Sequence, residues 1–310
     1  MNKKSKIYIA GHNGLVGSAI LRKLKNEGYK NLIFKSRNQL DLTNQNKVYN
    51  FLLNQKPDFI FIAAAKVGGI LANYTKKADF IRDNLFIQTN LIHGAFLSGV
   101  KRLIFLGSSC VYPRNCKQPI KEEYLLSGKL EESNDAYAIA KIAGIKMCKS
   151  YNQQYKVNYT CLMPTNTFGP KDNYDLSDSH FLPALIKKIY MLKKKKLKNL
   201  ILWGNGKAKR ELIYVDDLAD ACVFFMKKKT KHSLINIGTG KDYTIKHYTN
   251  LIANLILKKK ILIKYDHTKP NGTPRKVLDV SLARNYGWVA KCKLEDSILK
   301  CYSSFLSENN

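Results

Sequence analysis

Tyr137, Lys141 and Ser108 are the residues whose types and spacing first suggest a reaction. Tyr137 and Lys141 are four residues apart in a stretch with helical periodicity, so their side chains share one helix face. A nearby ammonium group favours the phenolate, which makes the tyrosine usable as an acid–base group near neutral pH. Ser108 follows an apolar stretch and can donate a hydrogen bond to a carbonyl oxygen that Tyr137 protonates. The YxxxK spacing alone is common on amphipathic helices, so the prediction of carbonyl chemistry depends on the combination.

A glycine-rich loop near the start of the chain has the spacing GxxGxxG. It lies between an apolar stretch at residues 6–10 and a helical pattern at 15–26. The first glycine allows a tight turn, the second lets the backbone approach a pyrophosphate, and the third permits close packing of helix on strand. The alternative is an ordinary turn, but the position inside a strand–helix–strand unit favours a dinucleotide site. The loop residues are Gly11, His12, Asn13, Gly14, Leu15, Val16 and Gly17.

The end of the second expected strand, at residues 31–35, indicates which dinucleotide binds. NAD sites usually place Asp or Glu there, to hold the ribose 2′-hydroxyl. This strand ends without a carboxylate and is followed by Lys35 and Arg37, which can neutralise a 2′-phosphate. The alternative is two solvated bases on a basic protein. We therefore expect NADP(H) as the cofactor, with Arg37 at its 2′-phosphate.

Cys110 places a thiol directly after the Ser108–Ser109 pair. A single cysteine after a strand is most often a small core residue, and a single histidine such as His180 is most often a cap or a surface residue. The chain has seven cysteines, which are scattered and form no CxxC pair, so neither a disulfide framework nor a metal site is predicted. The N-terminal residues lack the pattern of a cleavable export signal, so a reducing, cytoplasmic setting is expected.

The ordered motifs together resemble the extended short-chain dehydrogenase/reductase family, whose members act on nucleotide sugars. The resemblance covers nearly the whole chain and depends on long matched strings as well as on the glycine loop and the YxxxK pair. The strings run from Gly107 to Pro113, Ala64 to Ile70, Ala138 to Lys146, Met163 to Asn166, Asp178 to His180, Trp203 to Gly206, Arg210 to Glu211 and Gly272 to Lys276.

The resemblance implies a two-part reaction on GDP-4-keto-6-deoxy-D-mannose: epimerisation at C3 and C5, followed by NADPH-dependent reduction at C4. A C4 ketone acidifies the hydrogens on C3 and C5, so a base must remove each proton and an acid must return one to the opposite face. The family implies Cys110 as this base and His180 as this acid, and thiol and imidazole both titrate within reach of neutral pH. Tyr137 then protonates the C4 oxygen, while Lys141 lowers the tyrosine pKa and holds the nicotinamide ribose.

The resemblance also implies binding residues. It places Lys188, Trp203 and Arg210 at the GDP-sugar, and a guanidinium group suits a pyrophosphate. Asn271 joins this substrate set, although the family usually has Asp there, so the loss of charge puts affinity or base selectivity in doubt. The expected cofactor-lining residues are Asp41, Leu42, Asn84, Lys141, Pro164, Thr165, Asn166 and Thr167.

Elements that could position these residues alternate regularly along the first half of the chain. We expect strands at 6–10, 31–35, 58–63, 102–106 and 158–163, with helices at 15–26, 45–55, 78–98 and 135–155. This alternation predicts an α/β, Rossmann-like doubly wound parallel sheet. Residues 1–168 would form the NADP-binding domain, with a return segment near 212–240. Residues 169–310 would form most of a smaller, partly interleaved substrate domain.

The second half has a looser pattern. We expect helices at 180–192 and 216–227 and strands at 200–203 and 234–237, and the last 60 residues are expected to mix one helix with short strands. No run of about 18 apolar residues is present, so no transmembrane helix is expected. The family resemblance implies a homodimer packed through the two long helices at 78–98 and 135–155.

The formal net charge of +30 leaves a different class of function open, namely nucleic-acid binding or nucleotide sensing on the same fold. Only 8 of the 53 basic residues are arginine, and the lysine runs lie at the ends of helical patterns. We therefore favour a solvated surface and a small anionic substrate, without nucleic acid or membrane partners. A reductase or epimerase for a related GDP-4-keto sugar, such as a heptose, is a further alternative.

Overall fold

A six-stranded parallel sheet forms the centre of the computed structural model, which describes residues 1–176, 178–268 and 273–309. The strand order is β2-β1-β3-β4-β5-β9, so the chain winds outward in both directions from β1 and β3. The apolar strands are buried, which is typical of a parallel sheet covered on both faces. The strands are β1 (Ile7–Ala10), β2 (Leu32–Ile33), β3 (Phe59–Ile62), β4 (Arg102–Leu106), β5 (Asn158–Pro164) and β9 (Leu234–Ile237).

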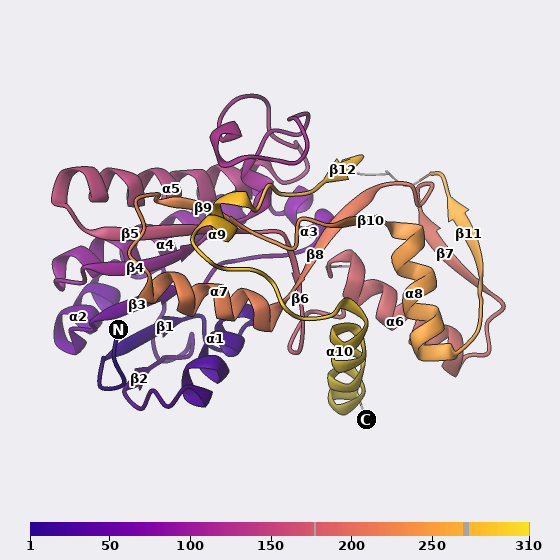
Figure 1. Cartoon of the computed structure of the whole chain (residues 1–310), viewed down its shortest axis with the longest axis horizontal. Coiled ribbons are helices and arrows are strands. Elements are labelled where there is room, and N and C mark those ends of the chain that lie inside the picture. The colour runs from indigo at the N-terminus through magenta and orange to yellow at the C-terminus, as the bar shows by residue number, and fades with distance from the viewer. Residues whose placement is uncertain (177, 269–272, 310) are drawn as a thin grey trace.

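Helices cover both faces of this sheet (Figure 1). Helices α1 (Leu15–Asn26) and α7 (Val215–Lys227) pack together on one face. On the other face α2 (Gln45–Gln55) packs on α4 (Lys77–Leu97), and α4 packs on α5 (Asp135–Tyr155). Each face has its own apolar core, and the expected doubly wound parallel sheet is confirmed.

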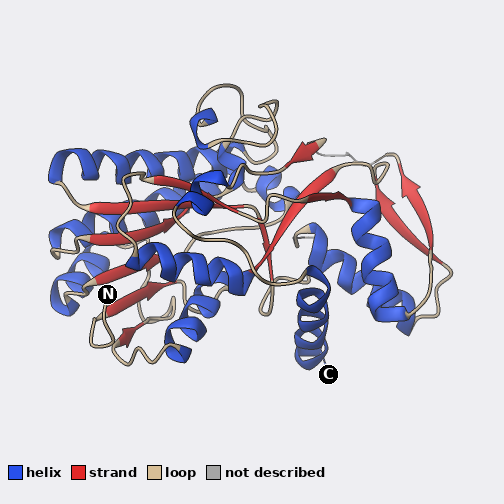
Figure 2. Cartoon of the chain, viewed as in Figure 1, coloured by secondary structure: helices blue, strands red, loops and turns tan. Residues whose placement is uncertain are grey.

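The second half of the chain adds smaller sheets and helices at one end of the molecule (Figure 2). Strand β8 (Lys209–Tyr214) pairs with β6 (Asn166–Phe168), β10 (Asp242–Thr244) and β12 (Arg275–Lys276). Strands β7 (Asn199–Trp203) and β11 (Leu262–Asp266) form a parallel pair. The remaining helices are α3 (Ile70–Thr75), α6 (Phe181–Lys194), α8 (Ile245–Leu257), α9 (Ser281–Asn285) and α10 (Leu294–Asn309), with 3₁₀ turns η1 (Ser109–Val111) and η2 (Glu122–Tyr124).

Several elements differ from the sequence-based expectation. Strand β8 was not predicted from the hydrophobic pattern, because it begins with Lys209, Arg210 and Glu211. Of these, Glu211 is completely buried. Strand β2 has two residues rather than five, since an edge strand has only one neighbour to pair with. The last 60 residues contain α9, α10 and the end of α8, where one helix was expected. No helix in the described ranges is long and apolar enough to span a bilayer.

Candidate active site

The carboxyl end of β4 positions the serine and the thiol. After Leu106 the chain turns into η1, and the Ser108 hydroxyl accepts a hydrogen bond from the Cys110 backbone N–H at 3.3 Å. Cys110 is 7% exposed and lines a pocket, so its thiol is both enclosed and reachable. Burial raises the Cys110 pKa, while the positive charges of Lys276 and Lys141 and the Ser108 hydroxyl oppose that rise.

Helix α5 brings Tyr137 and Lys141 to the same place. The Lys141 ammonium donates a hydrogen bond to the Leu106 carbonyl oxygen at 2.8 Å and lies 5.8 Å from the centre of the Tyr137 ring. Burial lowers the Lys141 pKa to about 8. The pKa of Tyr137 is raised by burial and further by Cys110, so the expected lowering by Lys141 is not found. The reason is that desolvation of the phenol dominates while the ammonium is directed at the β4 carbonyl.

His180 lies at the N-terminus of α6, and a contact between two loops fixes the segment before it. The Gly69 N–H donates to the Asp178 carbonyl oxygen at 2.8 Å and to its carboxylate at 2.9 Å. A β-carbon on Gly68 would lie 2.6 Å from that carboxylate, and one on Gly69 would lie 2.9 Å from the Ser179 carbonyl oxygen. The Gly68–Gly69 pair therefore lets the loop after β3 pack directly on the residues that precede His180.

His180 is exposed, and it is not among the residues that line the pocket beside Cys110. Desolvation lowers the His180 pKa, the Asp178 carboxylate raises it, and Lys276 lowers it further. Lys276 thus acts electrostatically on both His180 and Cys110, two residues 70 positions apart in sequence. The structure therefore brings the predicted acid and base into the field of one cation.

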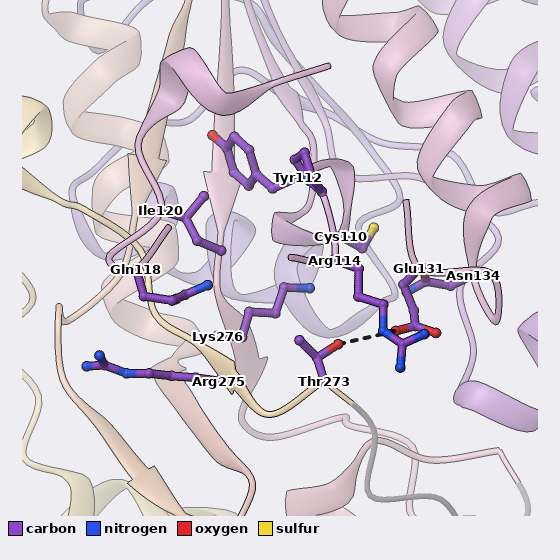
Figure 3. A pocket seen from close by; sticks show the side chains of 11 residues that line it. Cys110, Tyr112, Arg114, Gln118, Ile120, Glu131, Asn134, Thr273, Arg275 and Lys276 are labelled. Carbon is purple, nitrogen blue, oxygen red and sulfur yellow. Dashed lines mark hydrogen bonds and ion pairs between the residues drawn. The ribbon is translucent and has the colours of Figure 1, made fainter. Parts of the chain in front are cut away.

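The pocket beside Cys110 contains residues that sequence reasoning did not assign (Figure 3). It encloses about 350 Å³, including its open mouth. Glu131 forms an ion pair with Arg114 at 3.2 Å, and Thr273 donates a hydrogen bond to the same carboxylate oxygen at 3.4 Å. The Asn134 side-chain oxygen is buried without a hydrogen-bond partner among the described residues. The lining residues are Cys110, Tyr112, Pro113, Arg114, Gln118, Ile120, Glu131, Asn134, Thr273, Arg275 and Lys276.

Glu211 anchors the segment that carries Lys276. One oxygen of its buried carboxylate accepts from the N–H groups of Thr239 and Gly240 at 2.6 and 2.7 Å, and the other accepts from Leu278 at 2.8 Å. A β-carbon on Gly238 would lie 2.3 Å from the carboxylate, which explains the Gly-Thr-Gly turn. The carboxylate therefore joins β8, the turn after β9 and the chain just beyond β12.

Replacing Glu211 by Ala is expected to destabilise the protein strongly. The change leaves three N–H groups without an acceptor, of which that of Leu278 is buried, at a cost of about 2 kcal/mol or more in the free energy of unfolding. Urea denaturation would measure the loss. Glu123→Gln is the matched control, because that carboxylate is largely exposed and forms only a 4.0 Å ion pair. Equal stability of the Glu211 and Glu123 variants would disprove the anchoring role.

The glycine loop has the shape required at a phosphate site. Gly11 has φ +86°, and a β-carbon there would lie 2.6 Å from the Ala64 nitrogen; one on Gly17 would lie 2.0 Å from the Gly11 carbonyl oxygen. A β-carbon on Gly14 would meet only that carbonyl oxygen, at 3.6 Å, so this side of the loop is open. No side chain caps α1, which leaves its first N–H groups directed at the open side. The His12 ring packs against Phe34, with centroids 4.7 Å apart.

The other residues expected near the cofactor lie around this loop, mostly in structural contacts. Lys35 and Arg37 are exposed after β2. The Asp41 carboxylate accepts from the Thr43 N–H at 3.0 Å and hydroxyl at 2.8 Å, and these bonds lower the Asp41 pKa. The Leu42 carbonyl oxygen accepts a hydrogen bond from the Asn90 side chain at 3.0 Å.

Asn84 and the 164–167 segment are also engaged within the protein. The Asn84 side chain binds both the N–H and the carbonyl of Lys66 at 2.9 Å, so it orders the loop after β3. Thr165 and Asn166 both donate to the Glu211 carbonyl oxygen at 3.2 Å, and Thr167 donates to the Thr165 carbonyl oxygen at 3.2 Å. Pro164 ends β5 beside β9.

The expected substrate residues form two groups. The Lys188 ammonium donates to the Ile201 carbonyl oxygen at 3.3 Å and lies 5.8 Å from the Trp203 ring centre, so α6 and β7 present a cation beside an indole. Arg210 donates to the Thr273 carbonyl oxygen at 2.5 Å, and burial lowers its pKa. Lys276 interacts electrostatically with Arg210 and so connects it to the Cys110 pocket. Asn271 lies outside the described residues.

Comparison with known proteins identifies the family of this chain. The model of the NAD dependent epimerase/dehydratase family matches residues 7–238. GDP-L-fucose synthase 1 of Arabidopsis thaliana is 47% identical over 98% of this chain and 94% of its own length. GDP-L-fucose synthase of Escherichia coli K12 is 43% identical over 99% of this chain and 98% of its own. The solved structure of MlghC, a GDP-mannoheptose C4 reductase from Campylobacter jejuni with NADP bound, is 38% identical with a TM-score of 0.90, covering 99% of each chain. The chain therefore belongs to the NAD dependent epimerase/dehydratase family, on the branch that includes the GDP-L-fucose synthases.

Proposed function

We propose that this protein converts GDP-4-keto-6-deoxy-D-mannose to GDP-L-fucose, by epimerisation at C3 and C5 followed by NADPH-dependent reduction at C4. The observation that carries the proposal is the proximity of two kinds of acid–base group. The Cys110 thiol interacts electrostatically with both Tyr137 and Lys141, so an epimerase base and a reductase pair occupy one site. The relatives named as GDP-L-fucose synthases support the same reaction.

The chain's residues fit the cofactor that this reaction needs. The open side of Gly14 and the uncapped start of α1 suit a pyrophosphate, and exposed Lys35 and Arg37 suit a 2′-phosphate. NADPH, when bound, supplies the hydride for C4. Lys141 is the residue that would hold the nicotinamide ribose, since its ammonium lies under the carboxyl end of β4.

The epimerisation steps need one base and one acid at each carbon. The Cys110 thiolate removes the proton from C3 or C5, and the C–H electron pair moves toward the C4 carbonyl oxygen as the enolate forms. The Ser108 hydroxyl can donate a hydrogen bond to that oxygen. The His180 imidazolium returns a proton to the opposite face, which leaves a thiol and a neutral imidazole. Each inversion therefore ends with a proton transfer from Cys110 to solvent and another from solvent to His180.

The reduction step needs a proton donor at the C4 oxygen. Burial raises the Tyr137 pKa, so the phenol holds its proton at neutral pH and can donate it as charge develops on that oxygen. The Lys141 ammonium, 5.8 Å from the phenol ring centre, then stabilises the phenolate that results. The environment of Tyr137 therefore supports both donation of its proton and stabilisation of the phenolate until it is protonated again.

The test of the proposed function is a direct assay with GDP-4-keto-6-deoxy-D-mannose. Nicotinamide absorbance would follow the reduction, and NMR would establish the stereochemistry of the product. We expect NADPH oxidation with GDP-L-fucose as product. A product that keeps the D-manno configuration at C3 and C5 would show reduction without epimerisation and would contradict the proposal.

A related GDP-4-keto sugar is the second candidate substrate. It is favoured by the similarity to the GDP-mannoheptose C4 reductase, which covers 99% of each chain. The retained Cys110 and His180 favour an enzyme that epimerises as well as reduces. Parallel assays with the 6-deoxyhexose and the heptose derivatives would decide between the two by their kcat/KM values.

Replacing Arg37 by Ala is expected to weaken NADPH binding selectively. Loss of charge-assisted hydrogen bonds to the 2′-phosphate should raise the KM for NADPH about tenfold or more, with kcat nearly unchanged. The KM for NADH, which lacks that phosphate, should not rise. Lys30→Ala is the control, because Lys30 is exposed at the opposite end of β2. An equal rise in both KM values would contradict this assignment.

A cytoplasmic homodimer without nucleic acid or membrane partners completes the proposal. Large apolar side chains are exposed on both long helices, including Phe86 and Leu97 on α4 and Ile139 and Tyr155 on α5. All seven cysteines are free, which suits a reducing compartment. Sedimentation of Ile139→Glu would test the interface, and a dimer as stable as the unmodified protein would count against this helix pair.

A further inference from the structure

Lys276 is a half-buried cation that lines the pocket beside Cys110. Strand β12 places Lys276 opposite Arg210 of β8 and Arg275 opposite Lys209. Successive strand residues point to opposite faces, so the two side chains diverge (Figure 3). Both residues line the pocket that contains Cys110, but Arg275 forms an ion pair with Asp242 at 2.7 Å, whereas Lys276 acts electrostatically on Cys110.

The Lys276 ammonium has no carboxylate within ion-pair distance among the described residues. Glu131, the acidic residue in the pocket, already binds Arg114 and Thr273. Desolvation lowers the Lys276 pKa and nearby Arg210 lowers it further, whereas Cys110, Cys116 and Glu131 raise it. An ammonium that is held partly out of water without its own counter-ion is costly, so its position calls for a function.

Hydrogen bonds hold the backbone on both sides of Lys276, and before it the Lys209 N–H donates to the Pro274 carbonyl oxygen at 2.8 Å. The Val277 N–H donates to the Gln118 side chain at 2.9 Å, and the Leu278 N–H donates to Glu211 at 2.8 Å. The Ile120 N–H donates to the Val277 carbonyl oxygen at 2.8 Å. These bonds come from two separate parts of the chain, the 118–120 segment and β8, so the ammonium is positioned by the fold rather than by a flexible loop.

We propose that Lys276 is the positioning cation of the epimerisation centre, which stabilises the Cys110 thiolate in the pocket that they share and promotes proton release from His180. The proposal rests on the proposed function for its chemistry. No bond forms or breaks at Lys276 itself. Its ammonium balances the thiolate charge and repels the imidazolium proton.

The charges facing the two groups are consistent with this role. Lys276 is the largest of the influences that lower the Cys110 pKa, followed by the Ser108 hydroxyl and Lys141. At His180, Lys276 lowers the pKa and Asp178 opposes it. Lys276 therefore favours the deprotonated form of the base and the release of the proton from the acid.

The deciding experiment measures the Cys110 thiolate without substrate. Alkylation of the full-length protein by iodoacetamide would be followed from pH 6 to 10, with each cysteine quantified by mass spectrometry. In Lys276→Met the midpoint for Cys110 should rise by about one pH unit, which is about a tenfold loss of rate at pH 8. Lys276→Arg keeps the charge and should keep the midpoint.

Two controls separate this effect from unfolding and from general charge loss. Arg275→Met removes the neighbouring cation, which also lines the pocket but is paired with Asp242 and is not among the charges that act on Cys110, so the Cys110 midpoint should not change. Cys292 is exposed and should react at the same rate in every variant that is folded. An unchanged Cys110 midpoint in Lys276→Met overturns the proposal, as does an equal shift in Arg275→Met.

Deuterium exchange at C3 and C5 of the GDP-sugar in D₂O links the thiolate to epimerisation. In Lys276→Met the exchange should fall about tenfold at pH 8 and recover at higher pH. A loss of exchange with an unchanged alkylation midpoint would make Lys276 a substrate-binding residue and overturn the proposal. If the unmodified protein exchanges neither proton while the midpoint still shifts, the proposed function fails but the Lys276–Cys110 coupling is established.

Discussion

Cys110→Ser is expected to lower the rate of epimerisation by a factor of about 10² to 10⁴, while the rate of reduction stays largely unchanged. A serine hydroxyl has nearly the same size as the thiol. It is far too weak an acid to lose its proton near neutral pH, so it cannot supply the anionic base that removes the sugar protons. Deuterium exchange at C3 and C5 would measure epimerisation, and NADPH oxidation would measure reduction. The reduced product should then keep the D-manno configuration at C3 and C5, since the inversions no longer precede hydride transfer.

Cys116→Ser is the matched control for this prediction. Cys116 also interacts electrostatically with Lys276, but it does not line the pocket and it is less buried than Cys110. Epimerisation should therefore survive its replacement. Equal loss of exchange and of reduction in Cys110→Ser would argue against separate roles, because a general disturbance of the site would impair both steps.

The fold was predictable where one physical rule dominates. Apolar runs of about five residues that alternate with helical patterns specify a parallel sheet, and α2 and α5 have the predicted bounds. The rule fails where tertiary contacts, rather than the local hydrophobic pattern, determine the secondary structure. Strand β8 contains a charged residue that is buried only because N–H groups from Thr239, Gly240 and Leu278 surround it. The sequence near Glu211 does not indicate which backbone N–H groups will bind its carboxylate, because these groups lie 28 to 67 residues away.

Sequence patterns could indicate candidate site residues but not their electrostatic arrangement. The spacing of Tyr137 and Lys141 correctly places both on one helix, but the tyrosine pKa depends on burial, which spacing does not encode. The sequence pattern assigns no role to Lys276, because its position depends on the alternation of β12 and on contacts that Gln118 and Glu211 make with the next two residues. Only the folded chain brings its charge to Cys110 and His180.

The large positive charge of the protein does not by itself identify the cations that act in the site. Most lysines are exposed, and their number reveals nothing about the site. Lys141 and Lys276 differ because the protein encloses them beside Cys110, where a single charge interacts far more strongly than it does in water. The position of a cation, rather than the total of +30, therefore determines its chemical role.

Tyr137→Phe is expected to lower the rate of C4 reduction by a factor of about 10² to 10⁴, while deuterium exchange at C3 and C5 changes little. The substitution removes only the hydroxyl that protonates the C4 oxygen, and the ring keeps its place on α5. Because burial raises the Tyr137 pKa, the phenol of the unmodified protein stays protonated through neutral and mildly alkaline pH. Reduction should therefore not decline over that range through loss of the tyrosine proton.

Tyr155→Phe, at the exposed end of the same helix, is the control and should reduce the sugar at the normal rate. Together with Cys110→Ser, Tyr137→Phe forms a reciprocal pair, in which each variant stops one half of the reaction and spares the other. A Tyr137→Phe enzyme that still oxidises NADPH at the normal rate would require another proton donor at C4. The candidates are then few, because Lys141 is bound to the Leu106 carbonyl and His180 serves the opposite half of the reaction.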